Sequence, residues 1–354
     1  MKILHFIDTL GVGGAETLLK DTIIQYKKRF PEDEHLVMTL YRGGGYEQVI
    51  RSEAVYFNLN FTPAKLIQNY CTFRAFLNTH KIDIVHSHLN ESTIIARLFT
   101  PSSVKLVSTY HSGYLKSDAW NYSYKRLLAE KFGLKKTHYC LFVSDSVAKD
   151  TIPALGLKSN YEVLKNFFDE RFKPKYVFKN DDKLRLVTVG NLSRQKNQKL
   201  ILEALKRMNN PNISLDIYGE GNLREELQHK IDIHNLPVRL MGRTFITSEL
   251  LAAYDLFILS SLNEGLSIAQ IEAMATGMPA MYSKVASLQE VGKDAALFFQ
   301  NNSVSDLMEK LKEVYDNKTM LKDMSIKAIE YAKEYSAENK IIQLNRVYKK
   351  LLAQ

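Results

Sequence analysis

The sequence predicts an α/β protein made of two doubly wound domains, each with a parallel β-sheet between layers of helices. In both halves of the chain, short and almost entirely apolar segments alternate with amphipathic ones, which is typical of parallel strands buried on both faces. Between the halves, residues 166–183 are polar, contain a proline and show no clear period, as expected of a linker. The 354 residues, 45% of them hydrophobic, suffice for two cores.

The first half, residues 1–165, is predicted to be one Rossmann-like domain. Its expected strands lie near Lys2–Ile7, His35–Leu40, Ala54–Leu59, Asp83–His86, Lys105–Tyr110 and Tyr139–Val143. Its expected helices begin near Ala15, Ala64, Ser92, Ala119 and Ser144.

The second half, residues 184–336, repeats the pattern without a residue-level repeat. Its expected strands lie near Leu184–Val189, Asn212–Tyr218, Val238–Leu240, Asp255–Ser260, Ala280–Ser283 and Ala295–Phe299. Long helical segments follow from Ser303, and the last helix is predicted over residues 337–354.

The formal charge of +9 and the pI near 9.2 indicate an anionic partner: nucleic acid, an acidic membrane surface or a phosphorylated substrate. No aromatic RNA-binding strand motif, zinc finger or basic-helix dimer pattern occurs, which disfavours nucleic acid. No run of about 18 apolar residues occurs and an acid, Asp8, comes too early for a signal-peptide core, so we expect a cytoplasmic protein. Cys71 and Cys140 are too few for a disulfide framework, and both are expected to be core residues.

Residues 263–279 hold the most informative pattern. Ser267 is a good N-cap, Ile268–Thr276 has helical apolar spacing, and Gly277 is a stop signal. Glu264 therefore precedes the predicted helix and Glu272 lies within it.

The start of this helix is suited to a ligand. Backbone N–H groups of Gly265, Leu266 and Ser267 can donate to phosphate or sugar oxygens. The carboxylates of Glu264 and Glu272 can accept hydrogen bonds from sugar hydroxyls. The pattern predicts a grip for a sugar nucleotide.

A second glycine-rich segment, residues 8–16, runs from the first strand into a helix. Gly13 and Gly14 let the backbone approach a ligand, although a tight turn also requires glycine. The spacing is Gly-x-Gly-Gly, not the dinucleotide Gly-x-Gly-x-x-Gly, and the second strand ends without an acid to hold an adenosine ribose. This disfavours a nicotinamide oxidoreductase.

Cations follow two strands of the second half. Arg194 and Lys196 lie between a strand and a helix, where they can meet a diphosphate; Arg194 can equally be a solvated side chain. Residues 218–221 and Met241-Gly242-Arg243 also end strands, although Arg243 can simply be solvated.

Histidines mark the first half. His111 ends a buried strand, where a lone histidine is often only a hydrogen-bonded core residue. His86 and His88 place two imidazoles on one strand face and could imitate a metal trio with His111, but no neighbouring acid completes such a site. No Asp-x-Asp is placed to bind a metal for a leaving diphosphate, because Asp181-Asp182 lies in the linker, so no metal site is predicted.

Aromatic and basic residues are mixed at helical spacing over residues 120–136. Such a segment either contacts an anionic membrane or a lipid-linked acceptor, or forms a core helix with a charged outer face.

Together, Glu-x7-Glu with Gly-Leu-Ser after the first glutamate, Glu-Ala-Met-Ala-x-Gly-x-Pro from the second, and Gly-Gly-Ala-Glu near the N-terminus resemble the family 4 retaining glycosyltransferases of GT-B fold. The resemblance covers nearly the full chain. It implies two Rossmann-like domains facing a central cleft, an acceptor domain at 1–165, a donor domain at 184–336, and a last helix that crosses back to the first domain.

The resemblance also implies residue roles. Glu272 would bind the ribose, Glu264 the hydroxyls of the transferred sugar, and Lys196 with the Leu266 and Ser267 amides the diphosphate. Donor-side positions would further include Gly13, Gly14, Arg194, Arg243 and Gly265. His111 would contact the transferred sugar near the reacting carbon. The family usually has an arginine directly after the glycine that corresponds to Gly190. This sequence has Asn191 at that position, and Arg194 is the candidate replacement for the arginine.

The implied activity is retaining, metal-independent and cofactor-free transfer from a nucleoside-diphosphate sugar, with UDP favoured, to a saccharide or lipid-linked saccharide. The enzyme would be cytoplasmic or peripheral at the inner membrane face. The alternatives are a sugar-nucleotide 2-epimerase or phosphorylase-like enzyme of the same fold, and a sugar-nucleotide-binding protein without turnover.

Overall fold

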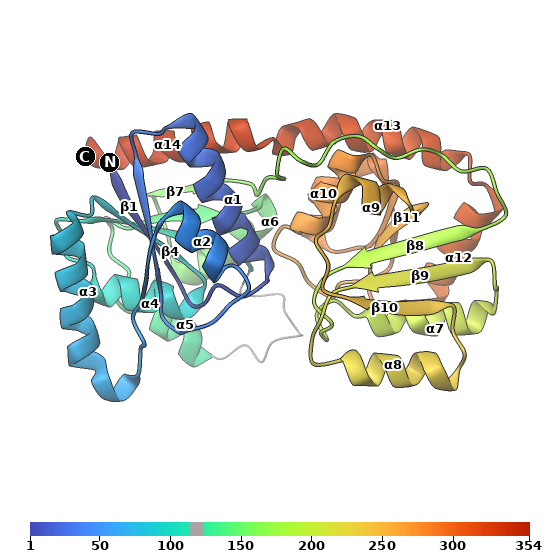
Figure 1. Ribbon diagram of the computed structural model, residues 1–354, viewed down its shortest axis with the longest axis horizontal. Coiled ribbons are helices and arrows are strands. Elements are labelled where there is room, and N and C mark those ends of the chain that lie inside the picture. The colour runs from blue at the N-terminus through green and yellow to red at the C-terminus, as the bar shows by residue number, and fades with distance from the viewer. Residues whose placement is uncertain (114–123) are drawn as a thin grey trace. The chain divides into compact units, whose positions relative to one another are not determined.

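The computed structural model describes residues 1–113 and 124–354, and the chain divides into two compact units. Within the described residues, the first unit contains residues 1–113, 124–167 and 337–354, and the second contains residues 168–336. Each unit is a parallel sheet with helices on both faces (Figure 1). The predicted fold class is confirmed.

The first unit has a seven-stranded sheet of order β3-β2-β1-β4-β5-β6-β7, with every pairing parallel. Its strands are β1 (Lys2–Ile7), β2 (Glu34–Thr39), β3 (Val55–Asn58), β4 (Ile84–His88), β5 (Lys105–Tyr110), β6 (Tyr139–Phe142) and β7 (Tyr161–Val163). Its helices are α1 (Gly14–Arg29), α2 (Glu47–Glu53), η1 (Pro63–Lys65), α3 (Leu66–His80), α4 (Asn90–Phe99), α5 (Tyr124–Lys131), α6 (Asp145–Leu155) and α14 (Ala337–Leu352).

Alternate strand residues pack against different helix layers in this unit, as the period of two requires. Leu4 and Phe6 of β1 pack with apolar residues of α3 and α4. Ile3, on the opposite face, packs with Tyr26 of α1 and with the apolar face of α14. The last helix of the sequence therefore completes the core of the first unit and lies beside α1 (Figure 1).

The second unit has a six-stranded parallel sheet of order β10-β9-β8-β11-β12-β13. Its strands are β8 (Leu184–Val189), β9 (Ile213–Tyr218), β10 (Val238–Gly242), β11 (Leu256–Leu259), β12 (Ala280–Ser283) and β13 (Ala296–Phe299). Its helices are α7 (Gln198–Met208), α8 (Arg224–Ile233), α9 (Ser248–Ala252), α10 (Ile268–Thr276), α11 (Ala286–Gly292), η2 (Lys293–Ala295), α12 (Val304–Asp316), α13 (Met320–Ala332) and η3 (Lys333–Tyr335). Helices α7 and α8 cover one face of this sheet, and α9 and α10 the other (Figure 1).

In both sheets the strand order reverses beside the first strand. The chain moves outward from β1 to β3 and returns to β4 on the other side of β1, and it does the same from β8 to β11. At such a reversal, the loops after the two neighbouring strands run to opposite sides of the sheet. This leaves a crevice at the carboxyl ends of the strands, where ligands bind. The reversal thus marks the loops after β1 and β4, and those after β8 and β11.

Several sequence predictions need correction. Cys71 is exposed on α3, so it is not a core residue, whereas Cys140 is buried in β6. The sequence did not predict β7 and α2, which are only three and seven residues long. The helix start expected near Ala119 lies outside the described residues, and the described part of α5 begins at Tyr124.

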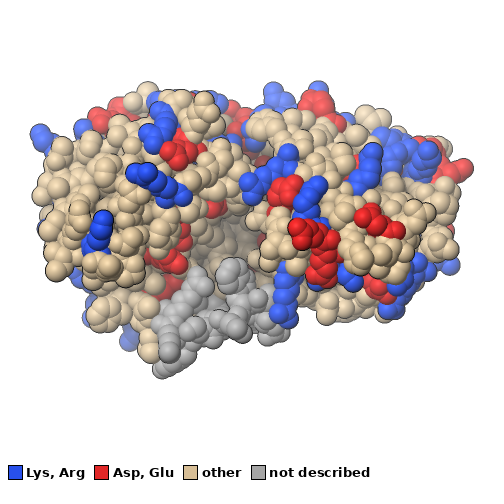
Figure 2. All heavy atoms as spheres, turned by 60° about the horizontal axis from the view of Figure 1, so that its bottom comes forward, with Lys and Arg blue, Asp and Glu red and all other residues tan. Residues whose placement is uncertain are grey.

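The net positive charge is not gathered into a continuous band on the face drawn in Figure 2, where Lys and Arg side chains are mixed with Asp and Glu. Among the described residues, no helix combines the length and the apolar character needed to cross a bilayer.

Candidate functional site

The site in the second unit is built from the two loops at its strand reversal. The loop after β8 carries Arg194 and Lys196, and the loop after β11 carries Glu264. Backbone and side-chain bonds tie the loops together: Leu262 N donates to Gln195 O at 2.8 Å, and Gln195 Nε2 donates to Asn263 O at 2.9 Å. These links fix the spacing of the charged side chains before any ligand arrives.

The centre of the site is an ion pair between Lys196 and Glu264. Lys196 Nζ lies 2.6 Å from Glu264 Oε1, and Ser261 Oγ donates to the same oxygen at 2.6 Å. The Glu264 side chain is buried, with 7% of its surface exposed, while Lys196 keeps 20%. Both bonds end on Oε1, which leaves Oε2 without a partner among the described residues. A charge-assisted pair in such a partly enclosed place is stronger than a surface ion pair.

Helix α10 begins beside this pair as predicted, at Ile268, and ends at Gly277 in a left-handed conformation with φ of 80°. Ser267 occupies the N-cap position, but its side chain makes no capping bond, which corrects the expected use of its hydroxyl. Gly265, Leu266 and Ser267 are all buried at the helix start, and the dipole of α10 favours an anion there. Glu272, one turn into α10, is 7% exposed.

Helix α7 supplies a second helix start at the site. It begins at Gln198, directly after Lys196 and Asn197, and Asn197 adopts a left-handed conformation without capping α7. Ser260 Oγ donates to the carbonyls of Lys196 and Asn197 at 2.9 Å each. The backbone around Lys196 is thus fastened to the end of β11.

Arg194, Arg243 and Asn191 are exposed. Among the described residues, neither arginine has an ion-pair or hydrogen-bond partner. Their guanidinium groups therefore stabilise no contact within the described part of the chain. Asn191 holds the loop through its carbonyl, which accepts from Gln198 Nε2 at 3.0 Å.

The glycines at the ends of β8 and β9 let two loops touch. A Cβ added to Gly219 would lie 2.0 Å from Gly190 O, and one added to Gly221 would lie 2.3 Å from Leu192 O. Gly219 also has a φ of 147°, which non-glycine residues rarely adopt. These glycines therefore serve loop packing, which brings Glu220 and the β8 loop together.

In the first unit, the loop after β1 holds Gly13 and Gly14 at the start of α1. A Cβ added to Gly13 would lie 2.5 Å from Glu16 Oε2, so the glutamate folds back over the glycine. Asp8 Oδ1 accepts from Ser92 N at 2.8 Å, which joins this loop to the start of α4. Burial raises the pKa of both Asp8 and Glu16. Two acceptors at this helix start suit hydroxyl groups better than phosphate.

His111 follows β5 at the same edge of the sheet. Burial lowers its pKa to about 4, and its buried Nε2 has no hydrogen-bond partner among the described residues. The strand end before it is held by Arg97, whose guanidinium donates to the Tyr110 hydroxyl and to the Glu130 carbonyl. A neutral imidazole in this position can donate or accept one hydrogen bond to a ligand.

The sequence did not predict roles for Ser261, Gln195 or Arg97 in positioning the site. Ser261 stands directly after an apolar strand and three residues before Glu264, a position that could have indicated a role. Gln195 and Arg97 act through contacts with residues 68 and 33 positions away, which no local pattern contains.

Two family models cover most of the chain in turn. Glycosyltransferase Family 4 matches residues 12–172, and Glycosyl transferases group 1 matches residues 169–334. The chain belongs to the family 4 glycosyltransferases of GT-B fold. It is an enzyme of the hexosyltransferase type.

Relatives and solved structures agree with this assignment. An uncharacterized glycosyltransferase of Methanocaldococcus jannaschii is 23% identical, with 96% of this chain and 95% of that protein covered. The UDP-Gal:alpha-D-GlcNAc-diphosphoundecaprenol alpha-1,3-galactosyltransferase of Escherichia coli is 26% identical over 74% of this chain and 73% of its own length. HepE of Anabaena in complex with UDP-glucose has the same fold, with a TM-score of 0.84, 18% identity and full coverage of both chains.

Proposed function

We propose that this glycosyltransferase moves a sugar from a nucleoside-diphosphate sugar, with UDP favoured, to a saccharide or lipid-linked saccharide acceptor. The Lys196–Glu264 pair between the starts of α7 and α10 carries the proposal, because it sets a cation for phosphate beside a carboxylate for sugar hydroxyls. The names of the Escherichia coli relative, which uses a UDP-sugar and a lipid diphosphate, and of the HepE complex support the donor and acceptor classes.

In the proposed donor complex, Lys196 and the start of α10 at Leu266 and Ser267 hold the diphosphate. Lys196 then shares its charge between phosphate and Glu264 Oε1, while Oε2 accepts from a hydroxyl of the transferred sugar. Glu272 accepts from the ribose hydroxyls. The exposed Arg194 supplies the positive charge that Asn191 lacks, and Arg243 and Gly265 complete the donor contacts.

The first unit is proposed to bind the acceptor and the reacting sugar. His111, neutral at physiological pH because burial lowers its pKa to about 4, donates a hydrogen bond to the transferred sugar. Gly13 and Gly14 let the loop after β1 approach the donor, and the neighbouring acids accept from sugar hydroxyls.

Transfer is proposed to retain the anomeric configuration without an added metal ion. The departing phosphate takes the acceptor proton as the new glycosidic bond forms and the bond to the diphosphate breaks, so no protein nucleophile is needed. Lys196 and helix starts stabilise the negative charge that builds on the diphosphate.

A panel of sugar nucleotides tests the activity. Nucleotide release that depends on an added acceptor, with a product of unchanged anomeric configuration by NMR, is the expected result. A changed sugar on an intact nucleotide would indicate a 2-epimerase, phosphate-dependent release of a sugar phosphate would indicate a phosphorylase-like reaction, and tight binding without turnover would indicate a binding protein.

A peripheral membrane contact is part of the proposal for a lipid-linked acceptor. In the described part of the 120–136 segment, Leu128 and Phe132 are 48% and 70% exposed and lie near the exposed Lys131, Lys135 and Lys136. Apolar side chains among lysines suit an anionic bilayer surface. Sedimentation with anionic vesicles should exceed that with neutral vesicles and fall in Phe132→Ser, whereas equal sedimentation with both would remove the membrane contact from the proposal.

A further inference from the structure

Three buried imidazoles lie together on one face of the sheet in the first unit. His5 of β1 and His86 of β4 are register partners, and His88 stands two positions further along β4 on the same face. Their exposed fractions are 0%, 3% and 5%. The apolar residues of α1 and α14 that pack on this face enclose them. All three lie in the first unit, where the ring centroid of His88 is 5.8 Å from that of His111.

The distances between the ring nitrogens are close to those between the ligand atoms of a metal site. His5 Nδ1 and His88 Nε2 are 3.2 Å apart, and one nitrogen from each of the three rings lies within 4.8 Å of the others. Two nitrogens bound to one tetrahedral zinc at about 2.0–2.1 Å are roughly 3.3 Å apart. The first two rings already have this separation, and the His86 ring needs only to move toward them.

The His5 and His86 rings also have hydrogen-bond partners on the side away from the proposed metal, and such partners orient metal-binding histidines. His5 Nε2 lies 2.9 Å from His35 Nδ1. His86 has a hydroxyl on either side, with Tyr348 Oη at 2.6 Å and Thr109 Oγ1 at 2.7 Å, so one remains when the other gives way to a metal.

The chemistry of the donor set selects the metal. Each of the three buried side chains offers one ring nitrogen, and no carboxylate belongs to the group. A set of imidazole nitrogens without a carboxylate suits Zn²⁺, Cu²⁺ or Ni²⁺ and not Mg²⁺ or Ca²⁺. With three protein ligands, a tetrahedral zinc ion takes a water molecule in its fourth position.

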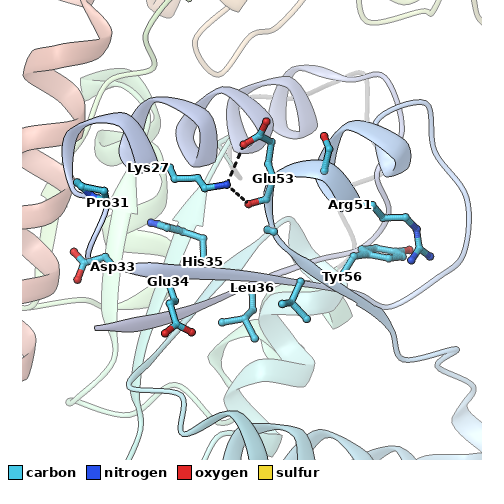
Figure 3. Close-up of a pocket in the computed structure, with 12 residues that line it drawn as sticks. Lys27, Pro31, Asp33, Glu34, His35, Leu36, Arg51, Glu53 and Tyr56 are labelled. Carbon is cyan, nitrogen blue, oxygen red and sulfur yellow. Dashed lines mark hydrogen bonds and ion pairs between the residues drawn. The ribbon is translucent and has the colours of Figure 1, made fainter.

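A surface pocket lies next to His35, the neighbour of the cluster. It has a volume of about 550 Å³, and its lining includes His35, Lys27, Asp33, Glu34 and Glu53 (Figure 3). His35 is 7% exposed and lies 2.9 Å from His5, so one side chain separates the pocket from His5. Its three carboxylates are already paired with cations: Asp33 with the N-terminal ammonium group, Glu34 with Lys2 and Glu53 with Lys27.

We propose that His5, His86 and His88 bind one divalent transition metal ion of the zinc type, which cross-links β1 and β4 beneath α14. The proposed role of the site is structural, because it joins two strands of the first unit. It does not depend on the proposed transfer reaction.

The test uses the full chain without a polyhistidine tag, loaded with Zn²⁺, desalted and analysed by mass spectrometry for metal. The expected result is about one equivalent of zinc, a melting temperature a few degrees above that of protein stripped by prolonged dialysis against a chelator, and a visible absorption band of tetrahedral type when Co²⁺ replaces Zn²⁺. His229→Gln, which removes an exposed histidine of the second unit, is the matched control and should keep the metal.

His88→Gln and His5→Gln should each lose at least nine tenths of the bound zinc, as well as the cobalt spectrum. Retention of a full equivalent in both folded variants would overturn the assignment, because the metal would then sit elsewhere. If neither variant folds, the wild-type measurement still decides: less than about a tenth of an equivalent after loading would mean that the rings form only a hydrogen-bonded cluster.

Discussion

Glu264 combines a structural contact with a predicted catalytic one. Its Oε1 accepts from Lys196 and Ser261, and its Oε2 is the oxygen left for a sugar hydroxyl. A carboxylate that is already oriented by two donors needs no rearrangement to meet the transition state. The same ion pair restricts the side-chain rotamers of Lys196. The diphosphate and the sugar of the donor would therefore be bound by two side chains that are already in contact.

We expect Glu264→Gln to lower turnover by roughly a hundredfold or more, because the sugar loses a charged acceptor. Affinity for the nucleoside diphosphate should stay within about threefold or tighten, since Lys196 is released for phosphate. Steady-state transfer and isothermal titration measure the two effects, and Glu309→Gln, an exposed glutamate of α12, is the control. His111→Ala should show the same separation; loss of diphosphate affinity in either variant would place that residue on the wrong end of the donor.

Glu272→Ala is expected to do the opposite and weaken diphosphate binding by about 1.5–3 kcal/mol, the value of hydrogen bonds to a charged acceptor. Titration with the nucleoside diphosphate measures this. An unchanged affinity in a folded variant would remove the ribose role.

The local pattern in the sequence located Glu264, Glu272 and the helix between Ile268 and Thr276, because helix starts and stops depend on neighbouring residues. The Lys196–Glu264 pair was not predictable in the same way. The two residues are 68 positions apart and meet only because β8 and β11 are neighbours in the sheet.

At the scale of elements, the central strands were the most predictable part. The strands expected at Lys2–Ile7, Lys105–Tyr110, Leu184–Val189 and Ala280–Ser283 have those bounds in the structure. Such strands are rich in apolar residues because both faces are buried. By contrast, β7 lies at the sheet edge, where Tyr161 and Glu162 are exposed, so its three residues carry little apolar signal. Cys71 was expected in the core but lies on the exposed side of α3.

The touching loops after β8 and β9 give a prediction for the elements that they join. Gly219→Ala should destabilise the second unit by more than about 2 kcal/mol, because the new Cβ meets the Gly190 carbonyl and the backbone conformation is unfavourable for alanine. Gly156→Ala in the first unit is the milder comparison, since its φ of 70° lies in the left-handed region and its Cβ would meet nothing within 4 Å. Urea unfolding of both variants measures the difference; equal losses would show that the loops can separate freely.

For the whole molecule, we predict that transfer is insensitive to added metal chelators. Rates in EDTA and in added Mg²⁺ or Mn²⁺ should agree within about twofold, because Lys196 and the helix starts take the place of a cation on the diphosphate. Initial rates in the three buffers are the measurement. Inactivation by EDTA that Mg²⁺ or Mn²⁺ reverses would show that the leaving group requires a metal.

The position of α14 in the first unit has a consequence for synthesis on the ribosome. His86 and its partner Tyr348 are 262 residues apart, and the whole second unit is translated between them. At about 5–20 residues per second, the sheet of the first unit, complete at Val163, therefore waits roughly 10–40 s for the helix that completes the cover of one of its faces. During that time the face bearing Ile3, Ile84 and Val107 lies open to chaperones and to neighbouring nascent chains, while the second unit can already fold.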